Sequence, residues 1–248
     1  MSSQWSRSIS WSKLNTYNTC PRQFKFKYVD DLEEEEEDQR MQDGIKFHEY
    51  MELYYDVVGS RPEPEDAVDL AREMFHEGDQ ARYKQWIQQW HQFNEWLYEK
   101  WGEEHWKPIL TEEWVEVEIG DHTHHGYIDA IHWDPDRQSY GVVDYKPKAR
   151  TGSRIKGQTA YYADFLLEVA ELLDGDVDWA GTYGYKDGQF ESWKVHWASR
   201  KATKRKIDSL IELDNGYEPD WGFHCQFCQF VDACYQEEEE TDNTLLNP

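Results

Sequence analysis

Three ionisable side chains on two neighbouring strand-like segments have the types and spacing of a metal-dependent hydrolytic site. Residues 141–146, GVVDYK, carry Asp144 and Lys146 two positions apart, so the alternation of a β-strand places both side chains on one face. Asp129 lies in the preceding segment, GYIDAI, where its carboxylate can converge on that of Asp144. Two close carboxylates repel each other unless a cation lies between them, which favours Mg²⁺ or Mn²⁺. A neighbouring lysine can orient the attacking water or help to deprotonate it.

A simpler interpretation fits the same residues. A surface hairpin with an Asp–Lys ion pair on one face would show the same spacing, and such a pair contributes little to stability. From Asp144 and Lys146 alone, this structural interpretation is favoured over a catalytic site.

The four cysteines form a second candidate site. Cys20 lies near the N-terminus, whereas Cys225, Cys228 and Cys234 follow a C-x₂-C-x₅-C pattern near the other end. Four thiols could form two disulfides, a zinc site or an iron–sulfur cluster. A reducing compartment and the tight spacing disfavour disulfides. Zinc fits four thiolate ligands equally well.

Basic residues are concentrated in three windows that contain no acid. Residues 1–29, 145–157 and 198–206 hold 15 of the 26 Lys and Arg, which leaves a net charge of −40 on the rest of the chain. If the windows meet in the fold, they form a positive face that suits a polyanion such as DNA; otherwise each is a locally solvated segment. The side chains that we expect to contact DNA are Lys148, Arg150, Arg154, Lys156, Arg200, Lys201, Lys204 and Arg205.

The formal net charge of −25 has two interpretations. A heavily solvated surface, as in a halophilic protein of a high-salt cytoplasm, is favoured over a protein that mimics or repels nucleic acid. The N-terminus lacks the apolar region of a signal peptide, and no apolar run approaches the roughly 18 residues that a membrane span needs. We therefore expect an intracellular, cytoplasmic protein, from a halophile or its virus-infected host, with no membrane partner.

A mixed α/β fold is needed to position these residues. Apolar periodicity and alternation predict helices over 10–28 (interrupted before Pro21), 41–58, 79–101, 153–172 and 198–213, and strands over 111–119, 124–133 and 139–146 with a later hairpin around Asp187-Gly188. The aromatic series from Trp86 to Trp101 is expected to be core rather than a base-stacking platform. This order argues an α/β sandwich around a mixed sheet.

The motifs and their order resemble the RecB-like type of PD-(D/E)xK nuclease. GYIDAI followed by GVVDYKPK resembles the G-x-x-D and D-Y-K motifs of that family. QTAYY supplies its Gln-x-x-x-Tyr motif with Gln158 and Tyr162, and GIKFH supplies an upstream histidine, His48, in a G-x-x-x-H context. A literal Pro-Asp pair ends at Asp136, but that residue lies in a predicted turn, so Asp129 is preferred.

The resemblance implies a restriction-endonuclease-like core, a mixed β-sheet flanked by helices, with a helical insertion. His48, Asp129, Asp144 and the carbonyl of Tyr145 would then bind Mg²⁺ or Mn²⁺. Lys146 would position the attacking water, and Gln158 and Tyr162 would orient Lys146 or the scissile strand.

The cysteine pattern also resembles AddB-like and CRISPR-associated relatives, which carry one cysteine before the nuclease core and three after it. This resemblance implies a 4Fe-4S cluster on Cys20, Cys225, Cys228 and Cys234 that joins the N- and C-terminal segments, with zinc as the alternative. We expect one nuclease domain over 1–236, with a helical N-terminal region over 1–108, a nuclease core over 109–197 and a C-terminal region over 198–236 that holds a basic helix and the cysteine cluster. An acidic tail at 237–248 is expected to follow it.

The expected function is that of a Mg²⁺- or Mn²⁺-dependent deoxyribonuclease, an exonuclease in DNA recombination, repair, CRISPR adaptation or viral DNA processing. No Walker-type G-x-x-x-x-G-K-[ST] loop occurs, so a helicase motor would come from a partner, and CRISPR-adaptation integrase proteins are a second kind of expected partner. Two alternatives stay open: a catalytically silent iron–sulfur module for DNA binding or assembly, and an acidic protein-interaction module.

Overall fold

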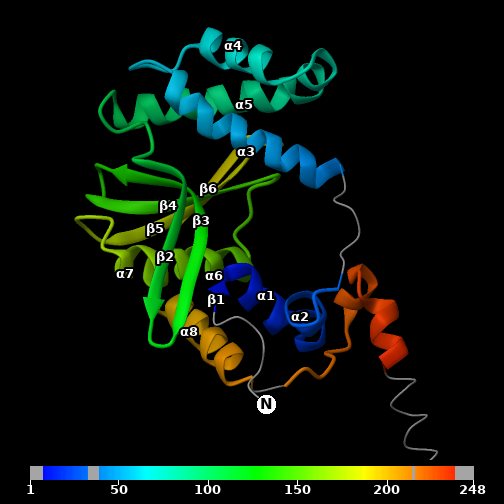
Figure 1. The fold of residues 1–248 in the computed structure, drawn as a ribbon. Helices are drawn as coiled ribbons and strands as arrows, with labels where there is room; N and C mark the ends of the chain where they lie inside the picture. Colours follow the sequence, from blue (N-terminus) through cyan, green and yellow to red (C-terminus); the bar gives the residue numbers. More distant parts are fainter. Residues whose placement is uncertain (1–7, 33–38, 214–215, 238–248) are drawn as a thin grey trace, which may run out of the picture. The chain divides into compact units, whose positions relative to one another are not determined.

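The computed structural model (Figure 1) describes residues 8–32, 39–213 and 216–237. These residues divide between two compact units. The first unit comprises the described residues up to 32, the segment 118–124 and those from 201 onwards. The second comprises residues 39–117 and 125–200. The acidic runs at 33–38 and 238–248, which include nearly all of the expected acidic tail, lie outside the described residues.

A mixed sheet forms the centre of the second unit. β2 (Leu110–Ile119) pairs with β3 (His122–Asp134), and the order then runs from β3 through β4 (Ser139–Lys146) and β5 (Val177–Gly184) to β6 (Gln189–Lys194). β3 and β4 are antiparallel, β4 and β5 parallel, and β5 and β6 antiparallel. Gly120 and Gly188 have φ of 63° and 64° in the turns of the β2–β3 and β5–β6 hairpins, a conformation that glycine adopts without strain. The predicted strands and hairpin are confirmed.

Two helices, α3 (Gln39–Val57) and α5 (Glu77–Trp101), cover one face of this sheet, and α4 (Pro64–Met74) packs on them on the side away from the sheet (Figure 1). Apolar residues of the three helices share one buried core with Val143 and Tyr145 of the sheet, which are 1% and 2% exposed. In α5, the buried rings of Trp90 and Phe93 belong to this core, so the expectation that the aromatic series is core is confirmed. The predictions did not include α4, although Pro64 at its first turn is a common helix start.

The helical crossover between β4 and β5 is more irregular than the single helix expected over 153–172. It consists of α6 (Ser153–Tyr161), a π-helical turn η1 (Tyr162–Leu167) and α7 (Glu168–Ala170). Such a crossover lets β5 run parallel to β4. An ideal Cβ on Gly126 of β3 would lie 3.0 Å from Cε1 of Tyr162 and 3.3 Å from Cδ1 of Leu166, so glycine lets this turn approach the sheet closely.

The first unit combines segments that are far apart in the sequence. It contains β1 (Ser8–Ser10), α1 (Trp11–Thr19), α2 (Pro21–Tyr28), the larger portion of α8 (Trp197–Glu212) and the 3-10 helix η2 (Phe223–Phe227). β1 pairs with β3, whose first three residues belong to this unit. Pro21 begins α2, as predicted.

Side chains near both ends of the chain meet in this first unit. Phe26, Phe230 and Cys234 form a small apolar core. Arg22 and Lys25 of α2 form ion pairs with Glu237. None of the helices in the described ranges has the length and apolar character to cross a membrane.

Candidate active site

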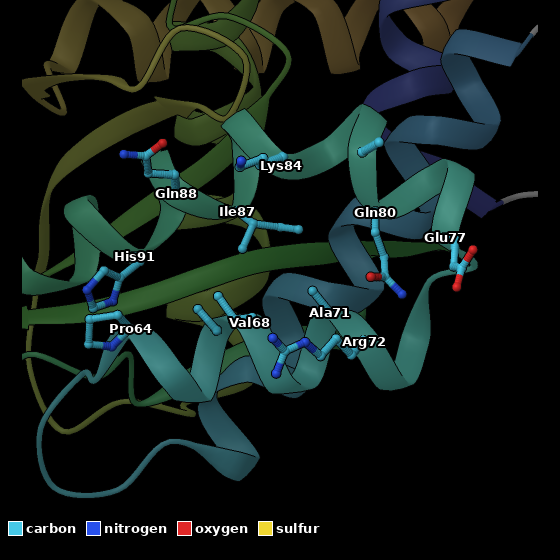
Figure 2. Close-up of a pocket in the computed structure, with 12 residues that line it drawn as sticks. Pro64, Val68, Ala71, Arg72, Glu77, Gln80, Lys84, Ile87, Gln88 and His91 are labelled. Carbon is cyan, nitrogen blue, oxygen red and sulfur yellow. The ribbon is translucent and has the colours of Figure 1, made fainter.

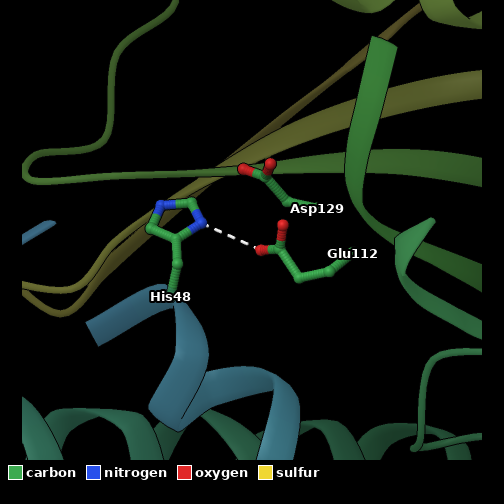
Figure 3. Close-up of side chains that lie close together, drawn as sticks. All are labelled: His48, Glu112 and Asp129. Atoms are coloured by element: carbon green, nitrogen blue, oxygen red, sulfur yellow. Dashed lines mark hydrogen bonds and ion pairs between the residues drawn. The ribbon is translucent and has the colours of Figure 1, made fainter. Parts of the chain in front are cut away.

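His48 of α3, Glu112 of β2 and Asp129 of β3 point toward one another (Figure 3). One potential metal-ligand atom from each lies within 4.8 Å of the others. Nδ1 of His48 lies 2.9 Å from Oε1 of Glu112, and Nε2 lies 3.2 Å from the carbonyl oxygen of Tyr145. The imidazole is therefore held between a carboxylate and the backbone of β4.

Glu112 is the member of this group that sequence reasoning missed. Its φ is 45°, in the left-handed region that non-glycine residues seldom adopt inside a strand. Strain of this kind persists where the surrounding structure holds it, and it is often found at functional sites. The sequence offered no signal, because β2 carries four glutamates, Glu112, Glu113, Glu116 and Glu118, with no motif to separate them.

Asp129 is tied to the strand that carries the second carboxylate. Its Oδ2 accepts a hydrogen bond from the backbone N–H of Tyr145 at 2.6 Å. Ala130 pairs with Val143 in the β3–β4 register, so Asp129 and Asp144 are the next residues along these two strands. The hydrogen bond therefore holds the Asp129 carboxylate against β4, close enough to Asp144 for its charge to raise the pKa of Asp144.

Asp144 and Lys146 share a face of β4, as their spacing predicted. Asp144 is 1% exposed, and its Oδ1 accepts a hydrogen bond from Nζ of Lys146 at 2.7 Å. Its Oδ2 is buried and has no hydrogen-bond partner among the described residues. Asp144 thus pairs with the lysine and is not a member of the compact His48, Glu112 and Asp129 group.

Burial and crowded acids shift the pKa values of these groups. Burial raises the pKa of Asp144 to about 6; Lys146 opposes the shift and Asp129 adds to it. Burial disfavours the charged His48 imidazolium, but Asp129 and Glu112 outweigh this effect and raise the pKa of His48. Burial likewise disfavours the charged form of Lys146, but Asp144 and Asp129 outweigh it and raise the pKa of Lys146. A cation beside these carboxylates would relieve their mutual repulsion.

Gln158 and Tyr162 lie together at the junction of α6 and η1. Gln158 Nε2 donates a hydrogen bond to the Tyr162 hydroxyl at 3.0 Å. Burial raises the pKa of Tyr162, and the nearby carboxylates of Asp129 and Asp144 raise it further, so the hydroxyl stays protonated close to both acids. The π-helical turn that begins at Tyr162 is a feature often found at functional sites.

Residues 8–235 match the family model of the PD-(D/E)XK nuclease superfamily. The chain belongs to this superfamily. A candidate exonuclease from Eubacterium rectale has a similar fold, with a TM-score of 0.50 and 12% identity over 90% of this chain and 87% of that one. A second solved structure, of a protein named SSO0001, has a TM-score of 0.39 and 13% identity over 91% of this chain and 84% of that one. None of the curated proteins compared with the chain matches it.

Nucleases of this superfamily typically use a divalent metal, and the His48 group has suitable donors for one. It offers an imidazole nitrogen and two carboxylates, and the carbonyl oxygen of Tyr145 lies next to His48. Oxygen-rich sites of this composition suit Mg²⁺ or Mn²⁺. The mixed sheet flanked by helices agrees with the restriction-endonuclease-like core expected from the motifs.

All four cysteines lie in the first unit, where they line one cavity together with Phe26 and Phe230. None of the four forms a disulfide, and the backbone N–H of Gly222 donates a hydrogen bond to Sγ of Cys225 at 3.4 Å. Burial raises the pKa of Cys228, and Cys20 and Cys225 raise it further. Within the described ranges, no three of the sulfur atoms lie within 4.8 Å of one another.

The basic residues expected to contact DNA differ in their surroundings. Lys148, Arg150 and Arg154 are exposed between the end of β4 and the first turn of α6. Arg154 is close enough to Lys146 to act against its positive charge. The first turn of α6 has no acidic residue and no side-chain cap, which leaves a positive helix end there.

The remaining basic residues differ in whether they are exposed and in whether they pair with an acid or a ring. Lys156 lies over the ring of Trp193, at 5.8 Å from its centre. Arg200 is paired with Asp164 at 2.9 Å, and Lys204 with Asp208 at 3.0 Å. Lys201 and Arg205 are exposed on α8. Arg200 and Lys204 are therefore less available to a phosphate than their exposed neighbours.

A cavity of about 630 Å³ lies between α4 and α5 (Figure 2). Apolar residues such as Val68, Ala71 and Ile87 line it, with Arg72 and Lys84 at its edges. None of the site residues predicted from the sequence lines this cavity.

Proposed function

We propose that this chain is a metal-dependent deoxyribonuclease that hydrolyses phosphodiester bonds, acting as an exonuclease. The observation that carries the proposal is the convergence of His48, Glu112 and Asp129 next to the Asp144–Lys146 pair, in a chain of the nuclease superfamily. The acidic group and the adjacent lysine are what phosphodiester hydrolysis with a bound cation requires.

Mg²⁺ or Mn²⁺ would be held by His48, Glu112, Asp129 and the carbonyl oxygen of Tyr145, with the buried, unpaired Oδ2 of Asp144 as a further oxygen donor. Glu112 is thereby added to the ligands expected from the sequence. When bound, the cation neutralises charge on the phosphate and makes the attacking water more acidic.

Lys146 positions the attacking water and holds a positive charge beside the phosphate. The acids around it outweigh its burial and raise its pKa, so at neutral pH it is a hydrogen-bond donor and not a base. Asp144 fixes the ammonium through Oδ1. Gln158 of α6 and Tyr162 of η1 are hydrogen-bonded to each other, and they orient Lys146 or the scissile strand from this crossover.

DNA phosphates are bound by the exposed residues Lys148, Arg150 and Arg154 at the positive end of α6. Lys156, Lys201 and Arg205 add further contacts, whereas Arg200 and Lys204 contribute less because each already pairs with an acid. The wider role lies in recombination, repair, CRISPR adaptation or viral DNA processing, with a helicase or an adaptation integrase as protein partner.

Cys20, Cys225, Cys228 and Cys234 bind a 4Fe-4S cluster in this proposal. Four cysteines that form no disulfide and line one cavity, and an N–H donor aimed at Cys225 Sγ, support it. A single tetrahedral zinc ion would hold all four sulfurs about 3.8 Å apart, whereas no three of them lie within 4.8 Å of one another among the described residues. The cluster joins the N-terminal helix to the C-terminal segment.

The test is cleavage of end-labelled linear DNA in Mn²⁺ by wild type and Lys146→Ala. We expect Lys146→Ala to be at least about 100-fold slower, whereas Lys84→Ala, a lysine of α5 far along the chain from the motifs, cleaves at the wild-type rate. Wild-type cleavage by Lys146→Ala would contradict the mechanism.

The alternatives give different results. A silent iron–sulfur module binds DNA in Ca²⁺ but cleaves it in neither Mg²⁺ nor Mn²⁺. An acidic protein-interaction module does not bind DNA in Ca²⁺ at all. If the acidic composition reflects a high-salt cytoplasm, fold and cleavage persist in molar KCl.

A further inference from the structure

Trp114 of β2 and Tyr127 of β3 form an exposed aromatic pair on the hairpin that carries Glu112 and Asp129. Their ring centres lie 4.8 Å apart, and the residues are 43% and 58% exposed. The ring of His125, two residues before Tyr127 on β3, lies 4.8 Å from that of Trp114. The three rings form a continuous aromatic strip on the surface of the second unit.

The strip lies directly beside the candidate metal site. Trp114 follows Glu112 by two residues, and Tyr127 precedes Asp129 by two. Trp114 contacts Tyr127 across the two strands, and Glu112 approaches Asp129 in the same way. Two residues along a strand correspond to about 6.6 Å, so the aromatic pair is the next cross-strand pair after the acidic one.

The charges around the aromatic strip determine which part of a nucleic acid can lie on it. Glu116, the next outward residue of β2 after Trp114, is exposed and repels phosphates. The positive residues near the site, Lys148, Arg150 and Arg154, lie instead after β4. A nucleic-acid strand at this site would therefore direct its phosphates to the basic segment and present its uncharged bases to the aromatic strip.

We propose that Trp114 and Tyr127 stack against unpaired bases next to the scissile phosphate, so that the substrate is single-stranded DNA. This inference rests on the proposed function, because it takes the His48 group as the cleavage site. Bases inside a duplex are already stacked on their neighbours and are not free to lie on a side chain, whereas aromatic platforms bind single strands.

Stacking also suits a protein with a net charge of −25. Phosphate contacts weaken steeply as salt rises, whereas contacts between aromatic rings and bases are uncharged. In molar salt the strip would retain its share of the affinity. A cross-strand aromatic pair that serves the hairpin alone would add a little stability and have no effect on DNA binding.

The test measures binding of a fluorescein-labelled oligothymidylate, of the same oligomer with abasic sites in place of thymidines, and of a matched duplex, all in Ca²⁺ at low and at molar KCl. The wild-type protein is expected to bind oligothymidylate about tenfold more tightly than the abasic oligomer. Trp114→Ala and Tyr127→Ala are expected to lose this preference at both salt concentrations, while Trp114→Phe keeps most of it.

Trp96→Ala is the matched control, because Trp96 is 40% exposed but lies on α5. It should keep the preference for bases. Thermal unfolding of each variant reports on folding, and the comparison of oligomers on the wild-type protein needs no variant. Equal binding of the abasic and thymidine oligomers by wild type, or tighter binding of the duplex, would overturn the inference.

Cleavage by wild type and Lys146→Ala, measured in parallel in Mn²⁺, separates this inference from the proposed function. Cleavage that depends on Lys146 but is accompanied by no preference for bases would support the nuclease mechanism and contradict the stacking inference. A preference for bases that depends on Trp114, without cleavage that depends on Lys146, would support a surface that binds single strands and contradict the nuclease mechanism.

Discussion

Oε1 of Glu112 lies 2.9 Å from Nδ1 of His48, and Glu112 reaches this position with a φ of 45°. The backbone of a strand is thus bent into a strained conformation at the residue that brings a second carboxylate to Asp129. Two effects at Glu112 destabilise the fold: its left-handed backbone conformation and the repulsion among the clustered acids. Stability and metal binding should therefore respond in opposite directions when Glu112 is replaced.

Glu112→Gly is expected to raise the free energy of unfolding by about 1 kcal/mol, since glycine adopts positive φ without strain. The same change should weaken Mn²⁺ binding at least about tenfold, because a donor beside His48 is lost. Thermal unfolding and calorimetric titration with Mn²⁺ measure the two effects.

Glu113→Gly is the control for this prediction. Its backbone has no positive φ, so glycine there should lower stability by about 0.5 to 1 kcal/mol and leave Mn²⁺ affinity unchanged. Loss of stability in both variants would show that the conformation of Glu112 carries no strain.

Local patterns predicted the portions of the site that lie on regular strands. Asp144 and Lys146 share a face because strand alternation is a property of the backbone, and their 2.7 Å contact follows from it. Gln158 and Tyr162 meet because residues four apart share one side of a helix. Glu112 could not be predicted in this way, because its side chain is aimed by an irregular φ that no neighbouring residue encodes.

Features that depend on contacts between distant segments could not be predicted from the sequence either. The first unit combines residues from both ends of the chain with the tip of the β2–β3 hairpin, and no local pattern reports such an association. The π-helical turn at Tyr162–Leu167 has the apolar spacing of an ordinary helix, so it was expected as one. The turn packs closely against Gly126 of β3, a contact that its own residues do not announce.

Gly126→Ala tests that packing. The added Cβ would lie 3.0 Å from Cε1 of Tyr162, so the ring must move by a few tenths of an ångström. We expect cleavage to slow by about tenfold and stability to fall by about 1 kcal/mol, because the Tyr162 hydroxyl leaves its place near Asp129 and Asp144. The cleavage rate and thermal unfolding report the two effects.

Gly152→Ala serves as the matched change on the same crossover, since nothing lies within 4 Å of a Cβ at that position. It should cleave DNA at nearly the wild-type rate. A Gly126→Ala protein as active as Gly152→Ala would show that the position of Tyr162 is unimportant for cleavage.

Cys228→Ala tests the cysteine site. Anaerobically purified wild-type protein is expected to contain iron and to absorb visible light, and Cys228→Ala to lose both. Hydrogen exchange should then speed up in α2 and η2, which the cysteines of the first unit join, while β4 and α5 of the second unit keep their protection. Phe227→Ala, a 77% exposed residue of the same 3-10 helix, should keep its iron. Colourless wild-type protein loaded with zinc would contradict the cluster.

We expect the buried His132 of β3 to make the free energy of unfolding depend on pH. It is fully buried beside Trp101, and neither ring nitrogen has a hydrogen-bond partner among the described residues. Burial lowers its pKa from 6.5 to about 3, so the folded protein keeps the ring neutral where the unfolded chain binds a proton. Its contribution to stability is complete above pH 6.5 and is lost as the pH falls from there toward 3, by about 1.4 kcal/mol per pH unit.

His132→Phe should remove this dependence. Between pH 6.5 and the acid transition, its free energy of unfolding should fall less steeply than that of wild type, by about 1.4 kcal/mol per pH unit. At neutral pH it should be about 1 kcal/mol more stable, because no unpaired polar atom remains buried. His76→Phe replaces an exposed histidine and should keep the wild-type slope. Denaturant unfolding across this pH range measures all three proteins, and equal slopes for His132→Phe and wild type would mean that the buried ring takes up its proton in the folded state.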